Sequence, residues 1–196
     1  MPLWRINFVP YHKKTLCLSV FVATFCIFIK TNHMKKLLLT LALITQLSFA
    51  QDKQAINTML DNWHKAAADV QFDSYFSYLT DDAIYIGTDA TENWNKKQFQ
   101  AFAKPYFDKG RAWSFTALER NIYFSKDGKM AWFDELLNTQ MKICRGSGVL
   151  VKVKNTWKIK HYVLSMTIPN DNTNDVIKTK SPIEDALIEK LKTKVP

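Results

Sequence analysis

The sequence predicts an α+β fold in which helices pack on one face of a curved antiparallel sheet. Three observations predict it. Apolar residues recur at helical spacing up to Phe107, strand-like alternation follows from Trp113 to Ile168, and short turn sequences separate the strands. Helices followed by a long antiparallel meander are typical of a segregated α+β domain with a single core.

Two helices are expected before the first strand. Gln51 to Val70 forms an amphipathic helix, because apolar residues recur every three or four positions: Ile56, Met59, Leu60, Trp63, Ala67 and Val70. A shorter helix from Asp73 to Leu79 follows, with Asp73 as its N-cap.

A short strand and a third helix complete the helical half. Ala83 to Ile86 is apolar and β-branched, which indicates a strand, and Gly87-Thr88-Asp89 turns the chain away from it. Asn95 to Phe107 is helical, and Pro105 is expected to distort its last turn.

Four strands are expected in two hairpins. Trp113 to Ser125 and Met130 to Met141 are joined by a turn with Asp127-Gly128 at its centre. Gly146 to Lys154 and Trp157 to Ile168 are joined across Asn155-Thr156. Because Lys158 and Lys160 favour water, strand alternation predicts that the residues between and beside them face the core: Trp157, Ile159 and His161.

The end of the chain is expected to be a polar linker and a final helix. Residues 170–179 lack periodicity, whereas Ser181 to Lys194 begins with a Ser-Pro-x-Glu sequence that puts Ser181 at the cap and Pro182 at the first helical position. The apolar stripe of this helix is thin, so weak docking and mobility both stay open. The expected domain covers residues 51–169, and residues 170–196 form a tail.

Met34 to Ala50 has the pattern of a cleavable signal peptide. Lys35 and Lys36 precede an apolar run, and Ser48-Phe49-Ala50 supplies small residues where a signal peptidase cuts. The run is too short for a membrane span of about 20 residues. We therefore expect a periplasmic or secreted protein that begins near Gln51 and has no stable membrane anchor once processed.

Residues 1–33 have two interpretations. Their apolar stretch, Thr15 to Ile29, could anchor the chain, although it is short for a span. Alternatively, the true start is Met34 and residues 1–33 are upstream sequence. We favour the second, because a complete signal begins at Met34.

Removing the leader changes the charge and the cysteine content. The whole chain has 27 Lys and Arg against 18 Asp and Glu, but six of the basic residues and none of the acidic ones precede Gln51. The near balance that remains argues against a nucleic-acid partner. Cys144 is the only cysteine left, so no intramolecular disulfide is possible. The core alone must stabilise the domain.

Three stretches carry a family resemblance: Tyr85 to Asp89 followed by Glu92 and Trp94; Cys144 to Leu150; and Trp157 to Tyr162 with Leu164-Ser165 and the closing Ile168 to Asn170. With them, the chain from about Gln54 to Pro169 resembles the SnoaL-like group of the nuclear-transport-factor-like (cystatin-like) superfamily. The resemblance implies a cone, in which a strongly bent sheet wraps around the first helices and leaves a mostly apolar pocket at one end. It also implies that homodimers through the outer sheet face are common, and that related pockets serve cyclases, isomerases, dehydratases or plain binding modules.

His161 and Asp134 are the candidate catalytic residues. A half-desolvated imidazole exchanges protons near neutral pH, and a carboxyl group inside an apolar cone has a raised pKa, as an acid or base requires. Asp134 and Glu135 are adjacent on a strand and point to opposite faces, and we expect Asp134 to face inward. The alternatives are a core-edge histidine for His161 and an ion pair with Arg145 for Asp134.

The candidate ligand-binding residues are mostly aromatic or charged side chains: Trp63, Tyr85, Glu92, Trp94, Arg145 and Ser165. Glu92 and Trp94, which follow the Gly87-Thr88-Asp89 turn, are the best candidates for the mouth of the cone, whereas most aromatic side chains are expected in the core. Gly146 and Gly148 are expected to permit bending of the sheet. No metal site is expected, because His64 and His161 are the only histidines after the leader. No cofactor is expected either, since an exported domain meets no nucleotide pool.

Three functions stay open at this stage. The sequence favours an exported protein that binds a small apolar or amphipathic molecule, as a homodimer. The second is a cofactor-independent cyclase, isomerase or dehydratase with a His161 and Asp134 pair. The third is a non-catalytic dimerisation or interaction module.

Overall fold

The computed structural model describes residue 36 and residues 50–193, and the chain from Lys53 onward forms one compact unit. The expected signal peptide and residues 1–33 lie outside the described residues, apart from Lys36 and Ala50. No helix in the described part of the chain is long and apolar enough to cross a membrane.

The helices that pack on the sheet come before its last four strands, as expected for an α+β domain, and a further helix follows those strands. A first helix extends to residue 68. The elements after it are α2 (Phe72–Ser77), β1 (Leu79–Ile86), β2 (Asn93–Asn95), α3 (Lys96–Asp108), β3 (Thr116–Phe124), β4 (Met130–Thr139), β5 (Lys142–Val153), β6 (Thr156–Met166), the 3-10 turn η1 (Asn170–Asn172) and α4 (Thr173–Lys192).

The six strands form one sheet in the order β2-β1-β6-β5-β4-β3. The predicted fold class is confirmed, but the sheet is mixed, because β1 pairs with β6 in parallel and all other pairs are antiparallel. The expectation of a wholly antiparallel sheet is wrong at this pair. Strands β1 and β6 lie far apart in the sequence, and strand alternation carries no information on the direction of such a pairing.

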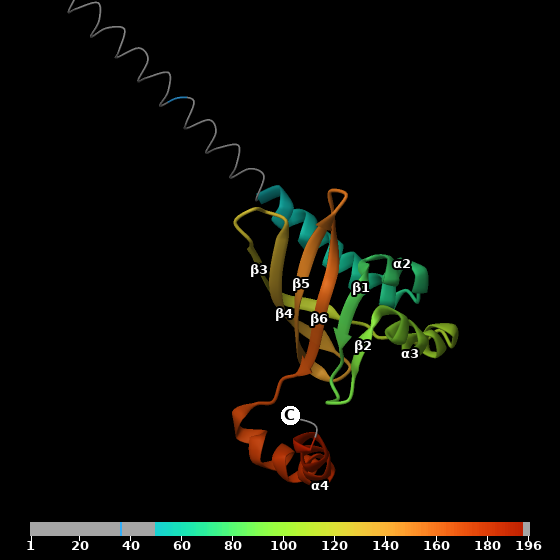
Figure 1. Cartoon of the computed structure of the whole chain (residues 1–196), viewed down its shortest axis with the longest axis vertical. Coiled ribbons are helices and arrows are strands. Elements are labelled where there is room, and N and C mark those ends of the chain that lie inside the picture. The colour runs from blue at the N-terminus through green and yellow to red at the C-terminus, as the bar shows by residue number, and fades with distance from the viewer. Residues whose placement is uncertain (1–35, 37–49, 194–196) are drawn as a thin grey trace, which may run out of the picture. The chain divides into compact units, whose positions relative to one another are not determined.

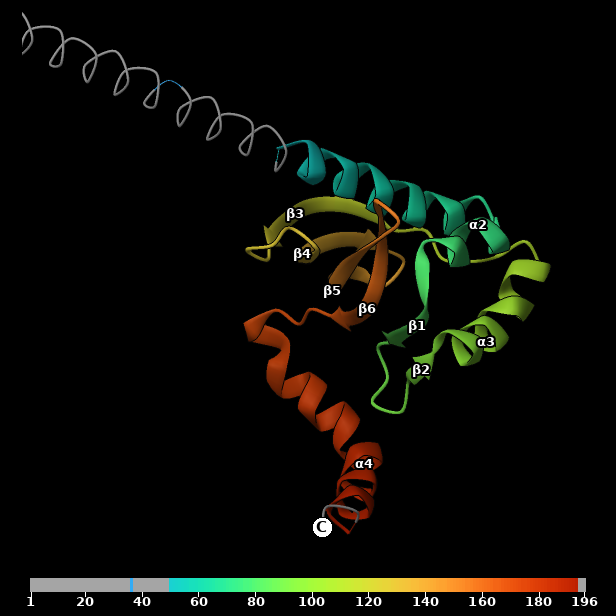
Figure 2. The same ribbon diagram turned by 45° about the horizontal axis from the view of Figure 1, so that its top comes forward.

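The sheet curves around the helices (Figures 1 and 2). Residues 53–68 lie across its inner face, and α2 and α3 lie beside β1. The inward side of the first helix is fully buried at Ile56, Leu60, Trp63 and Ala67, as its periodicity predicts. We call the face that carries the helices the inner face and the opposite one the outer face.

A side-chain cap explains where α3 begins, whereas α2 begins without one. Asn95 caps α3 and forms a capping box with Gln98, so that the helix starts at Lys96 and not at Asn95. Pro105 lies inside α3, as expected. Asp73 does not cap α2; it lies in the first turn, and Gln71 holds the cap position without a side-chain hydrogen bond. Leu79 belongs to β1, which is longer than predicted.

A β-bulge in β6 changes which residues face the core. Trp157 and Ile159 are buried as predicted. The ladder to β5 then shifts register, with Ile159 opposite Leu150 and His161 opposite Val149, so Lys160 has no partner. One extra residue reverses the alternation that follows it. Tyr162 therefore faces inward, and the prediction that His161 faces the core is wrong.

The C-terminal segment also differs from its prediction. Residues 173–192 form one helix, and Pro182 lies within it, not at its start. Ser181 does not cap a helix; its hydroxyl donates to the Ile177 carbonyl at 2.8 Å. A proline removes its own N–H donor but leaves the turns before it able to form, which explains the earlier start. No residue of α4 is buried.

Candidate functional site

Among the residues that the structure describes, Glu135 is the one buried acidic side chain. It lies on β4 with its residue 1% exposed, whereas the side chain of its neighbour Asp134 is 33% exposed. The prediction that Asp134 faces inward is therefore wrong. Ala131, Phe133 and Leu137 are buried beside Glu135, and a strand directs every second residue to the same face.

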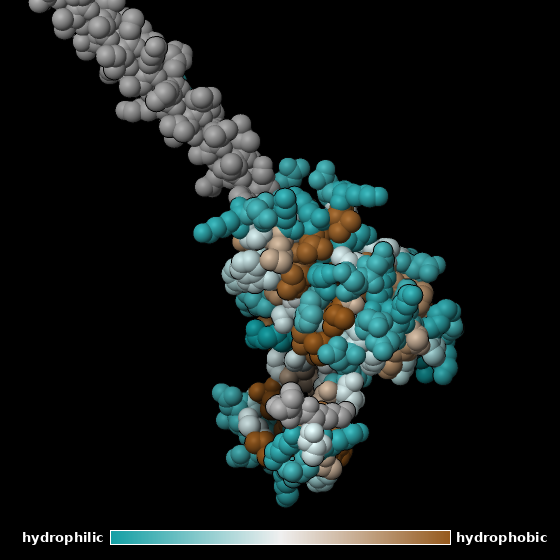
Figure 3. All heavy atoms as spheres, in the orientation of Figure 1, coloured by the Kyte–Doolittle hydropathy of each residue, from teal (hydrophilic) through white to brown (hydrophobic). Residues whose placement is uncertain are grey.

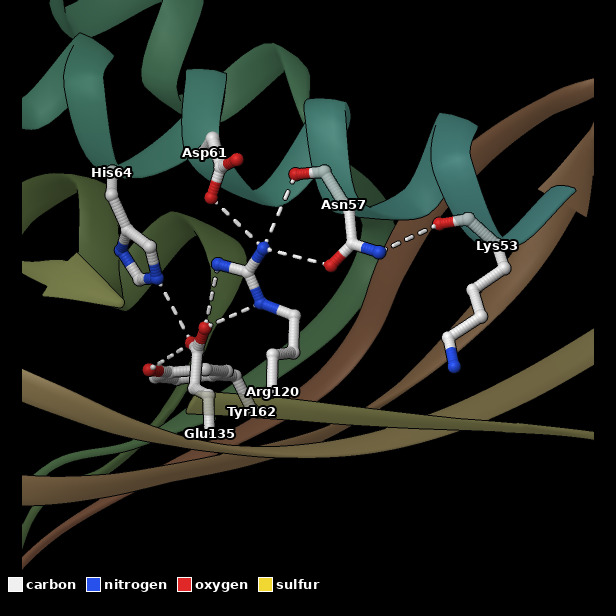
Figure 4. Close-up of polar contacts among 7 residues, drawn as sticks. All are labelled: Lys53, Asn57, Asp61, His64, Arg120, Glu135 and Tyr162. Carbon is white, nitrogen blue, oxygen red and sulfur yellow. Dashed lines mark hydrogen bonds and ion pairs between the residues drawn. The ribbon is translucent and has the colours of Figure 1, made fainter. Parts of the chain in front are cut away.

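Three side chains satisfy the Glu135 carboxylate (Figure 4). His64 Nε2 lies 2.9 Å from Oε1, and the Tyr162 hydroxyl donates to the same oxygen at 3.2 Å. Arg120 Nε donates to Oε2 at 2.8 Å. These partners come from the first helix, β6 and β3, so the contacts join one helix to three strands. We call these four residues and Asp61 the buried network.

Arg120 connects the network to the surface of the first helix. Its side chain is only 5% exposed, and Nη1 donates to Asp61 Oδ1 at 2.9 Å and to the Asn57 carbonyl at 3.2 Å. A buried guanidinium is costly unless it is paired and hydrogen-bonded. Arg120 satisfies this requirement with one carboxylate inside the cone and one at its edge.

Burial and charge oppose each other at Glu135. Burial raises the pKa of Glu135, but the hydrogen bond and charge of His64, together with Arg120, outweigh it and hold the pKa below its usual value. Burial and the nearby Glu135 carboxylate raise the pKa of Tyr162, so the phenol keeps its proton and can donate it. Arg120 Nη2 also lies 2.8 Å from Glu135 Oε2 as an ion pair, but it makes no hydrogen bond.

Gly146 makes room for one of these hydrogen bonds. It lies opposite Glu135 on β5, and a Cβ atom there would come within 2.2 Å of the Tyr162 hydroxyl oxygen. The sequence suggested that this glycine permits bending of the sheet. The contact gives it a further role, because any side chain would displace the Tyr162 hydroxyl from Glu135.

The sequence analysis missed His64, Arg120, Glu135 and Tyr162. One signal was available: Asn57, Asp61 and His64 recur at four- and three-residue steps and form a polar stripe beside the apolar one. His64 also shares its helix face with Leu60 and Ala67, which are buried. A polar side chain on a buried helix face requires a hydrogen-bond partner, which predicts a polar residue on the inner face of the strands.

The other predicted catalytic and polar residues lie on the outer face. Asp134 on β4 lies opposite Ser147 of β5. His161 lies on β6, two strands away from β4, opposite Val149 of β5. Arg145 lies opposite Ser165, and its Nη1 is 3.8 Å from Asp134 Oδ1, the ion pair that we had weighed as an alternative. No hydrogen bond among the described residues joins His161 to Asp134.

Three predicted ligand-binding residues come together at one end of the cone. Tyr85, Glu92 and Trp94 line a cavity of about 150 Å³, which we call the mouth cavity. Its remaining walls are Gly87, Thr88, Phe99, Phe102, Trp113, Phe115, Gln140, Met141 and Leu164. Trp63, by contrast, is buried in the core against Tyr75 and Tyr162 and does not line the mouth cavity.

The aromatic walls of the mouth cavity are nearly parallel. The ring centroids of Tyr85 and Phe99 are 3.8 Å apart, with 15° between the ring planes. Those of Trp94 and Phe102 are 4.4 Å apart, with 25° between the planes. Trp113 stacks on Phe99 at 5.8 Å. Such a wall suits a flat or apolar group.

The buried network lies one side chain behind this cavity. The His64 ring is 5.9 Å from Phe115, and the Tyr162 ring is 5.4 Å from Tyr85. Neither His64 nor Glu135 lines the mouth cavity. The network therefore supports the cavity wall and does not face a ligand there.

Two further hollows are found in the described part of the chain. One of about 220 Å³ adjoins the mouth cavity, since the two share Phe102, Trp113 and Gln140, and it also contacts Arg111. The other is a wide groove of about 680 Å³ beside β1 and β6. Its lysines have partners: Lys96 binds Asp81 at 3.1 Å, Lys160 pairs with Asp82, and Lys158 donates to the Ser77 carbonyl. We assign the groove no ligand, because each of its lysines already has a partner within the protein.

Metal ligands do not gather in the described residues, where no group of three His, Cys, Asp or Glu side chains could hold an ion. Cys144 is buried, with Sγ 3.5 Å from the Thr139 hydroxyl.

Replacing Glu135 with Gln is expected to lower the free energy of unfolding by about 3–5 kcal/mol, because Arg120 stays buried and keeps only the exposed Asp61 as a charge partner. The adjacent Asp134→Asn is the control and should cost about 0–1 kcal/mol, since that carboxylate is partly exposed. Urea denaturation followed by circular dichroism measures both. Equal losses in the two variants would contradict a special role for Glu135.

The Glu135 contribution should also depend on pH. Because its folded pKa is lower than its unfolded value of about 4.3, the stabilisation is complete above that pH and is lost as the pH falls through the folded pKa. The difference in melting temperature between the wild type and Glu135→Gln should therefore shrink below about pH 4. Melting curves at stepped pH test this, and a constant difference would show that the carboxylate does not act through its charge.

Comparison with known proteins agrees with this architecture. The family model described as a SnoaL-like domain matches residues 56–169. Three solved structures are similar at low identity: an NTF2-like protein of unknown function from Pseudomonas putida (12% identity, TM-score 0.54, 63% of this chain and 92% of that one), a domain of unknown function with a cystatin-like fold from Nostoc punctiforme (15%, 0.52, 73% and 98%) and the association domain of CaMKII from C. elegans (19%, 0.51, 61% and 98%).

Identities this low show the fold alone. No curated protein matches the chain. The family model, in contrast, spans more than half of the sequence and ends at Pro169, three residues after the end of β6 at Met166. The chain therefore belongs to the SnoaL-like domain family.

Proposed function

We propose that this protein binds a small apolar or amphipathic molecule in the mouth cavity, outside the cytoplasm and as a homodimer. The observation that carries the proposal is the cavity itself, an aromatic-lined space of about 150 Å³ with one carboxylate at the end of a SnoaL-like domain. Domains of this fold often contain a ligand pocket, and apolar walls with few polar groups are typical of small-molecule sites.

The size of the cavity limits what it can take. Sites for drug-sized molecules measure roughly 300–1,000 Å³. The core behind the mouth is filled by aromatic side chains, among them Trp63, Tyr75 and Phe76. A compact group of a few heavy atoms therefore fits the mouth cavity, and the rest of a longer ligand would lie in the adjoining hollow beside Arg111.

The geometry gives less support to an enzyme. His161 and Asp134 lie on the outer face, away from the cavity. The buried His64 side chain bonds to Glu135, and Glu135 also accepts hydrogen bonds from Arg120 and Tyr162. Neither His64 nor Glu135 lines the cavity. A general acid or base must reach its substrate within hydrogen-bond distance, directly or through one water. Binding is therefore the better-supported function.

Export is part of the proposal because of the leader pattern. Met34 to Ala50 has a basic start, an apolar run and small residues at its end, and cleavage after Ala50 would release a chain that begins at Gln51.

The homodimer is proposed from the outer face of the sheet. Figure 3 shows apolar residues among polar ones over β5 and β6 on this face. Tyr123 and Trp132 are stacked on it at 6.0 Å and are 47% and 46% exposed. Exposed apolar surface of this kind is typical of an interaction site. The similarity to an association domain is compatible with self-association.

Trp94→Ala is expected to weaken ligand binding about tenfold, because it removes a stacking wall of the mouth cavity. Trp132→Ala is the matched control and should leave binding unchanged, since that indole lies on the outer face. The assay is native mass spectrometry of protein recovered from the periplasm after expression from Met34, followed by thermal shift with a lipophile panel. The measured mass also reports cleavage after Ala50. No retained ligand and no thermal shift in the wild type would refute the binding function.

Trp132→Lys is expected to convert the dimer to a monomer, because a charge at the centre of a packed sheet face is costly to bury. Size-exclusion chromatography with light scattering gives the mass, and Trp94→Ala should remain dimeric. A wild-type protein that is monomeric at every concentration would contradict the dimer.

A further inference from the structure

Glu92 is the only charged residue among those that line the mouth cavity. The other lining residues include six aromatic side chains, and the polar ones are the neutral Thr88 and Gln140. A single negative charge therefore faces a space whose walls are otherwise apolar or weakly polar.

The loop before β2 holds the Glu92 carboxylate in place. Oε2 accepts a hydrogen bond from the Asp89 backbone N–H at 3.1 Å, and the Gly87 N–H donates to the Glu92 carbonyl at 3.0 Å. A Cβ atom at Gly87 would come within 2.1 Å of Oε2, so the glycine gives the carboxylate its room. Within the described residues, no lysine, arginine or histidine pairs with Glu92.

The charge of Glu92 reaches the cavity wall. Burial raises the pKa of Tyr85, and the nearby Glu92 carboxylate raises it further. Tyr85 lines the cavity and stacks on Phe99, so the carboxylate acts on the same walls that would contact a ligand.

A neutral occupant and a cationic one would meet this site differently. A neutral apolar group would displace water from the carboxylate and offer nothing in return, which is unfavourable. A cation would compensate the charge and would also be attracted to the faces of the aromatic rings, as quaternary ammonium groups are in aromatic cages. Arg111 lines the adjoining hollow, and its positive charge makes that hollow less suitable for the same cation.

We propose that the mouth cavity binds the cationic head of a small organic ammonium compound, with Glu92 as the counter-charge and the aromatic walls around the alkyl groups. This inference rests on the proposed function and names the ligand class of the same cavity. The volume of about 150 Å³ suits a compact head such as a trimethylammonium group, with a short tail directed into the adjoining hollow.

A pair of probes with the same shape separates charge from size. Choline carries a trimethylammonium head, and 3,3-dimethylbutan-1-ol carries the neutral tert-butyl group in its place. Binding to the full-length processed protein is followed by tryptophan fluorescence and isothermal titration calorimetry. Choline should bind at least about tenfold more tightly than the neutral alcohol, because only the cation compensates a partly desolvated carboxylate.

Glu92→Gln is the decisive variant. Its amide oxygen can still accept from the Asp89 N–H, so the loop is kept while the charge is removed. The variant should bind choline about tenfold more weakly and lose the preference over the alcohol. Glu119→Gln is the matched control, an exposed residue that is not among those lining the cavity, and it should keep the preference. Thermal melts verify that both variants are folded.

The outcomes separate this inference from the proposed function. If the alcohol binds as tightly as choline or more tightly, the proposal of a cationic ligand is overturned. If Trp94→Ala then weakens the binding of both probes, the mouth cavity is still the binding site. A choline affinity that Glu92→Gln leaves unchanged also overturns it. If neither probe binds the wild type and the lipophile panel is negative as well, the proposed function fails with it.

Discussion

The Glu135 carboxylate, hydrogen-bonded to Arg120, His64 and Tyr162, joins the first helix to three strands of the sheet. A buried charge tolerates little displacement of its partners. Each lost hydrogen bond would leave a buried donor or acceptor bonded to neither water nor protein, which lowers stability. The position of the helix across the inner face is therefore fixed by electrostatics as well as by apolar packing. Gly146 serves the same arrangement, because its missing side chain leaves the space in which Tyr162 reaches Glu135.

This fixed arrangement shapes the mouth cavity from behind. Phe115 contacts His64, and Tyr85 contacts Tyr162, so two side chains of the cavity wall pack against the network. The buried acid and base, Glu135 and His64, hold the architecture. The two carboxylates differ in their surroundings: Glu135 is enclosed by donors, whereas Glu92 lines the aromatic cavity and has no cationic partner within the described residues.

Much of the fold and part of the site could be predicted from the sequence. Helices and strands follow from apolar spacing, and the turn at Asp127-Gly128 follows from residue preferences, because these signals are local. Glu92 and Trp94 are predicted mouth residues and Tyr85 is a predicted ligand-binding residue, and all three line one cavity. Asp134 and His161 were assigned to the wrong face, since adjacent polar residues on a strand leave parity ambiguous and the bulge at Lys160 reverses it.

The sequence by itself determined most of the helices and strands and the buried side of the first helix, since apolar spacing within each segment encodes them. Only the tertiary structure decided that β1 runs parallel to β6, that Glu135 and not Asp134 points inward, and that His64 meets it across 71 positions of sequence. The physical reason is that a carboxylate, a guanidinium and an imidazole from distant elements gain their stabilising contacts only when the fold removes them from water together.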